Sequence, residues 1–72
     1  MAEKIDPNEL SLSFMRAFGG DDGKHVLDHL RNMTLNRALG PDVTTEHLRH
    51  LEGQRFLVSY IENQIQRGKN DE

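Results

Sequence analysis

Four histidines are the residues of this chain whose type and spacing come closest to a recognisable chemistry. His25 and His29 stand four residues apart, which places both imidazoles on one face of a helix, as in helical zinc sites. A complete site needs further ligands, and His47 and His50 are the donors that the sequence offers. The simpler interpretation is that all four are exposed helix residues beside acidic neighbours. We favour it, and we expect neither a metal nor another cofactor.

The remaining polar motifs do not form a catalytic pattern. Three serines lie within helical patterns and have no base motif beside them: Ser11, Ser13 and Ser59. The glycines at 19, 20 and 23 suggest a phosphate loop, but Asp21 and Asp22 would repel an anion and no Gly-Lys-Ser/Thr follows. A turn between two helices explains them better. Because a chain of 72 residues has little room for a pocket, we expect that it is not an enzyme.

Length and composition narrow the class of protein further. The chain has 72 residues, no cysteine and a net charge of -3, so a single small domain must be stabilised by helix packing or by association with a partner. Its nine basic residues are scattered singly, whereas nucleic-acid binders cluster them. No apolar run approaches the roughly 20 residues of a membrane span. We therefore expect a cytosolic, soluble protein that binds neither nucleic acid nor a membrane.

Apolar periodicity and capping residues predict three helices. Asp6 and Pro7 are typical of a helix N-cap and first helical position, and Gly19-Gly20 predicts the end of this first helix in a left-handed glycine conformation. The second helix is expected from about Gly23 to Ala38, capped by Asp21 or Asp22 and stopped by Gly40-Pro41. The third is expected from Thr44 or Thr45 to about Arg67, with Gly68 just beyond its end.

These helices predict an all-α fold, a small three-helix antiparallel bundle with a long C-terminal helix. Residues 1–72 form one domain, with 1–5 and 69–72 expected to be disordered. The expected core consists of Phe14, Phe18, Val26, Leu30, Leu51, Val58 and Ile61. Leu51, Val58 and Ile65 are spaced by seven, a pattern that serves an intramolecular core or a dimer seam, and we favour the core.

The third helix carries apolar groups on more than one side. Phe56 and Tyr60 lie roughly opposite the main stripe, and Leu57 lies between the two. These side chains either contribute to the core or form a protein-interaction surface together with Gly53. A glycine within a helix suggests close packing, here by Phe14 or Phe18, although a solvent-exposed glycine or a kink is an alternative. Arg55 is expected to pair with Glu52, Glu62 or an acid on the first helix.

Two segments of the sequence resemble a known family. One has two aromatic residues and a Gly-Lys-x-Val-Leu stretch: Phe14, Phe18, Gly23, Lys24, Val26 and Leu27. The other is a Glu-Gly-x-Arg element followed by apolar residues: Glu52, Gly53, Arg55, Leu57 and Val58. In these residues the chain resembles the short Bbp-type proteins of Bordetella phages and other tailed phages. The resemblance implies a small phage protein encoded near head and connector genes, with no catalytic residues to carry over.

The resemblance and the surplus apolar surface together predict a protein that acts by contact. We expect an accessory or assembly factor in virion morphogenesis, located in the host cytoplasm or associated with the virion, with a phage structural protein, a host protein or a second copy as partner. An alternative is a phage-encoded modulator that binds and inhibits a host protein. A third hypothesis is a metal- or DNA-associated regulator that uses the histidines and Arg49.

Overall fold

The longest element of the computed structural model is the C-terminal helix α3, Thr45–Asn70. The structure describes residues 6–37 and 39–70, so the predicted disorder of residues 1–5, 71 and 72 lies outside the described residues. The Thr44 side chain caps α3 by accepting a hydrogen bond from the His47 amide at 3.1 Å, as predicted. The helix continues through Gly68, so the prediction that it ends there and that disorder begins at residue 69 is wrong.

Helix α1, Pro7–Phe18, begins where its capping residues predict. The Asp6 carboxylate accepts a hydrogen bond from the Asn8 amide at 2.9 Å, and Pro7 occupies the first turn. Gly19 ends the helix, but with φ -80° and ψ -21° it stays in the right-handed region. The predicted left-handed glycine is therefore wrong, and no described residue has a positive φ.

Helix α2, Asp21–Met33, is shifted from its predicted range at both ends. It starts two residues early because Gly20 is extended and serves as the N-cap, which places both aspartates in the first turn near the positive end of the helix dipole. It ends at Met33, short of the predicted Ala38, which lies outside the described residues. Beyond this end, the Arg55 guanidinium donates hydrogen bonds to the carbonyl oxygens of Thr34 (3.0 Å) and Arg37 (2.8 Å).

This contact corrects the prediction for Arg55, which was expected to pair with an acid. An arginine beyond a helix end can satisfy carbonyl groups that would otherwise need another helical turn. Arg55 therefore caps the region after α2, and the acid Glu62 pairs with Arg31 instead. The sequence could not show this, because the partner atoms belong to the backbone.

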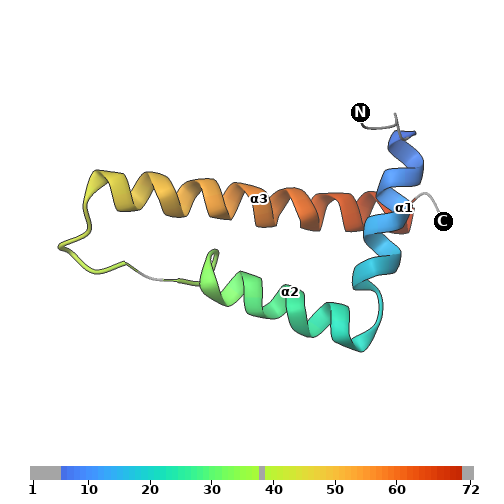
Figure 1. Cartoon of the computed structure of the whole chain (residues 1–72), viewed down its shortest axis with the longest axis horizontal. Coiled ribbons are helices and arrows are strands. Elements are labelled where there is room, and N and C mark those ends of the chain that lie inside the picture. Colours follow the sequence, from blue (N-terminus) through green and yellow to red (C-terminus); the bar gives the residue numbers. More distant parts are fainter. Residues whose placement is uncertain (1–5, 38, 71–72) are drawn as a thin grey trace, which may run out of the picture.

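The three helices confirm the predicted all-α fold with a long C-terminal helix (Figure 1). Helix α2 runs beside α3 in the opposite direction, while α1 crosses the C-terminal part of α3 (Figure 1). The molecule measures 44 × 31 × 21 Å, with a radius of gyration of 14.8 Å. Within the described residues no helix is long and apolar enough to cross a membrane.

The buried apolar core is small and follows one stripe of α3. Its members are Leu51, Val58 and Ile65, spaced by seven, together with Leu27 from α2. The heptad pattern therefore serves the intramolecular core, as predicted. Of the other expected core residues, four are only partly buried: Phe14, Phe18, Leu30 and Ile61. Val26 is 52% exposed, so its assignment to the core is wrong; α2 is rotated so that Leu27 faces inward instead.

The tightest packing in the molecule lies where α1 crosses α3. Ser11 is fully buried there, and its hydroxyl donates a hydrogen bond to Oε1 of the buried Gln64 at 2.7 Å. Gly68 packs against the same turn of α1: a Cβ atom at this position would overlap the Ser11 carbonyl oxygen and lie 2.7 Å from the Cβ of Met15. Gly68 is thus the residue that permits this crossing, because a larger residue would force α1 away.

Candidate functional site

Four residues at the middle of α3 form an exposed surface that we call the α3 patch: Gly53, Phe56, Leu57 and Tyr60. Phe56 is 74% exposed, Leu57 58% and Tyr60 40%. Their spacing of three, four and seven residues makes them neighbours on the surface of one helix. The structure therefore brings together the four residues predicted from the sequence and leaves their apolar side chains outside the core.

Gly53 contributes no side chain to the α3 patch. A Cβ atom added there would meet nothing within 4 Å, so the predicted close packing by Phe14 or Phe18 is wrong. A glycine inside a helix costs about 1 kcal/mol relative to alanine. At Gly68 the crossing of α1 offsets this cost, whereas nothing in the described part of the chain approaches Gly53. The surface is therefore notched beside Phe56 and Leu57.

Tyr60 connects the α3 patch to helix α1. Its ring packs edge-on against Phe14, with the ring centroids 5.9 Å apart and the planes at 85°. Such aromatic pairs contribute about 0.5–1.5 kcal/mol beyond the area they bury. Tyr60 is therefore held in place by the fold, while Phe56 and Leu57 remain open to solvent.

Polar residues border the α3 patch along the helix. Exposed charged and amide side chains precede and follow it: Glu46, Arg49, Asn63 and Arg67. An apolar centre with a polar rim is typical of surfaces that bind another protein. Three other large apolar residues are exposed: Val26 and Met33 on α2, and Leu48 near the start of α3.

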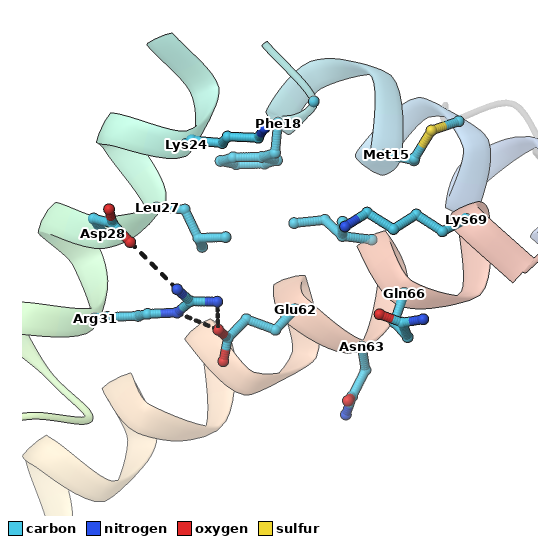
Figure 2. A pocket seen from close by; sticks show the side chains of 12 residues that line it. Met15, Phe18, Lys24, Leu27, Asp28, Arg31, Glu62, Asn63, Gln66 and Lys69 are labelled. Carbon is cyan, nitrogen blue, oxygen red and sulfur yellow. Dashed lines mark hydrogen bonds and ion pairs between the residues drawn. The ribbon is translucent and has the colours of Figure 1, made fainter. Parts of the chain in front are cut away.

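A groove of about 860 Å³ lies between the three helices (Figure 2). Its apolar lining comes from Met15, Phe18, Leu27 and Ile65. Sequence reasoning missed it, because apolar periodicity identifies the faces of helices but not how far two faces separate.

An ion-pair cluster lies along one side of this groove (Figure 2). The Arg31 guanidinium pairs with the Glu62 carboxylate and also with Asp28, whose Oδ1 lies 3.3 Å from Nη1. These groups join α2 to α3, although the Arg31 side chain is 40% exposed and such pairs contribute only about 0–1 kcal/mol. Three charged groups of the groove are thus paired with each other, and Lys24 and Lys69 add two further positive charges to its lining.

The histidines do not assemble into a site. Across residues 6–37 and 39–70, no three His, Asp or Glu side chains lie close enough together to hold a metal ion. His25 and His29 are exposed on α2, and His47 and His50 are exposed near the start of α3. His50 Nε2 lies 3.2 Å from the Gln54 amide nitrogen. The i, i+4 spacing therefore lacks the further ligands that helical zinc sites require.

Fold and surface together define a small all-α protein of three helices with an apolar patch on its longest helix. A family model described as Bbp19-like phage protein matches residues 14–71, and the chain belongs to this family. The match includes both segments on which the resemblance to Bbp-type phage proteins was based, so that resemblance is confirmed. Comparisons with curated proteins and with solved structures gave no match.

Proposed function

We propose that this phage protein is a non-enzymatic accessory or assembly factor in virion morphogenesis, which acts by binding protein through the α3 patch. It works in the host cytoplasm during assembly and is carried on the particle or its precursors. Membership of a phage protein family supports the phage setting. The exposed apolar residues of the α3 patch support action by contact.

The observation that carries this proposal is the exposure of Phe56 and Leu57 at the midpoint of the longest helix. Full burial of a Phe or Leu side chain stabilises a complex by roughly 1.5–3 kcal/mol. Aromatic residues at the centre of an interface commonly dominate binding. The α3 patch therefore offers exposed apolar side chains that a protein partner can bury.

The proposal is tested by placing Phe56→Ser and Leu57→Ser together in the phage genome. Purified virions and assembly intermediates are analysed for this chain by quantitative mass spectrometry, and particle yield is counted. Val26→Ser is the matched control, because Val26 is also an exposed apolar residue but lies on α2. We expect the patch variant to lose particle association or reduce particle yield, while the control behaves as wild type.

Another outcome of the same experiment would contradict the proposed assembly role. A wild-type chain that is absent from particles and intermediates, and that copurifies through Phe56 and Leu57 with one host protein, would refute the assembly role. It would instead establish the alternative of a phage-encoded modulator that inhibits a host protein.

A further inference from the structure

We infer that the α3 patch binds a second copy of this chain, with the two α3 helices antiparallel about a two-fold axis between Phe56 and Leu57. This inference rests on the proposed function in that it names the partner of the same patch. Three observations carry it: the excess exposed area of the chain, the position of the patch along α3, and the sequence of residues on either side of it.

The chain exposes more surface than a compact monomer of its size. Its accessible surface is 5803 Å² for a mass of 8.3 kDa, against about 4,600 Å² expected for a folded monomer of that mass. Its radius of gyration of 14.8 Å likewise exceeds the roughly 11 Å expected for 72 residues. This excess belongs to the whole chain, and the exposed side chains of the α3 patch contribute to it.

The α3 patch is placed for pairing along the whole helix. Helix α3 spans Thr45–Asn70, so Phe56 and Leu57 lie at its middle and an antiparallel partner centred there extends towards both ends of α3. The buried stripe through Val58 faces the core, and Phe56 lies roughly 160° away from it around the helix. A second helix on the patch therefore lies away from α2, and at Tyr60 it also meets α1, whose Phe14 packs on that ring.

When two α3 helices pair in opposite directions, the residues on this face meet residues of complementary size and charge on the partner. Glu46, Gly53, Tyr60 and Arg67 are spaced by seven and form one line along α3. In an antiparallel two-fold pair, residues equally distant from the axis lie opposite each other, which places Gly53 against Tyr60 and Glu46 against Arg67. The Tyr60 ring of each copy then faces the notch at Gly53 of the other copy. Glu46 of each copy likewise faces Arg67 of the other.

A parallel pair lacks this complementarity. It would set Glu46 against Glu46 and Arg67 against Arg67, which are repulsive contacts, and Gly53 against Gly53, which leaves the notch empty. The antiparallel register also gives the exposed glycine a role, because nothing in the described part of the chain fills the space beside it.

The test is sedimentation equilibrium of the full chain from about 1 μM upward, since interfaces of standard size bind between μM and pM. We expect a mass of twice 8.3 kDa, or one that rises towards that value as the concentration increases. Phe56→Glu is expected to raise the dissociation constant at least about a hundredfold, because each dimer buries the ring twice. Circular dichroism of this variant should show unchanged helix content, because Phe56 is 74% exposed.

Charge reversal tests the register independently of folding. Glu46→Arg and Arg67→Glu should each raise the dissociation constant roughly tenfold, and the double variant should restore it, because opposite charges again face each other. Asp42→Arg is the matched control for Glu46→Arg, since it makes the same change in net charge at an exposed loop residue and should leave the dissociation constant unchanged.

A chain that remains at 8.3 kDa at every concentration overturns the inference, and so does a dimer that Phe56→Glu leaves intact. Failure of the double charge variant to restore binding overturns the antiparallel register. If the chain forms this dimer but never associates with particles, the inference stands and the proposed function is refuted. If the chain is a monomer and its patch variant loses particle association, the proposed function stands and the inference is refuted.

Discussion

The same substitution at two glycines of α3 should change stability in opposite directions. Gly68→Ala places a methyl group against the Ser11 carbonyl oxygen and 2.7 Å from the Cβ of Met15, and a backbone atom cannot rotate away. Gly53→Ala places the same group in open space. Both changes gain about 1 kcal/mol of helix propensity, so the difference between them reports the crossing of α1 alone.

The magnitudes follow from these contacts. Overpacking costs about 1–3 kcal/mol, and the rigid contact at Gly68 places it at the upper end, so Gly68→Ala should be destabilised by roughly 2 kcal/mol net of the propensity gain. Gly53→Ala should be stabilised by about 1 kcal/mol. For a domain of this size the melting temperature should fall by about 10 °C in the first variant and rise by about 5 °C in the second.

Thermal melts followed by far-ultraviolet circular dichroism measure both values. They are made in a Phe56→Ser background and at low concentration, so that association does not contribute to the melting temperature. A Gly68→Ala variant as stable as its parent would show that α1 does not cross α3 at this residue. A destabilised Gly53→Ala variant would show that some part of the same chain packs against Gly53.

Three further predictions concern single contacts. Arg55→Ala should lower the free energy of unfolding by about 1–2 kcal/mol in urea titrations, and Arg55→Lys should not recover it, because an ammonium group lacks the planar fork that reaches two carbonyls. Ser11→Ala should lower the free energy of unfolding by about 1–3 kcal/mol, because Oε1 of the buried Gln64 loses its hydrogen-bond donor. Adding Gln64→Leu should recover much of this loss, and no recovery would contradict the pairing of the two side chains. In dilute solution Phe56→Ser should change stability by less than about 0.5 kcal/mol, whereas Tyr60→Ser should cost about 1 kcal/mol through its contact with Phe14; equal losses would contradict the difference in exposure.

Local signals predicted the helices and the positions of several caps. Asp6 and Thr44 act as N-caps because their side chains satisfy backbone amides within three residues, an interaction that is encoded locally. The heptad through Val58 was assigned correctly to the core. The α3 patch was also visible in the sequence, because Phe56 and Tyr60 fall off the main apolar stripe of a helix with few partners.

Several features of the structure depend on tertiary contacts, which local sequence signals do not reveal. Close packing was expected at Gly53 and a helix end at Gly68, yet another helix crosses α3 at Gly68 and nothing approaches Gly53 in the described part of the chain. Arg55 reaches from α3 to the carbonyl oxygens of Thr34 and Arg37 beyond the end of α2, a contact that helix propensity within α2 could not predict. The burial of Ser11 likewise depends on Gln64, a partner more than fifty residues away in the chain.

The measurement that tests the central claim most directly is the solvent exposure of the Phe56 ring as a function of concentration. The chain contains three phenylalanines, so fluorophenylalanine labelling gives three ¹⁹F resonances, and the one lost in Phe56→Leu identifies this ring. We predict a full H₂O/D₂O isotope shift in dilute solution that decreases over the concentrations at which the mass doubles. A Phe56 ring that is shielded at every concentration, or exposed at every concentration, would contradict the account.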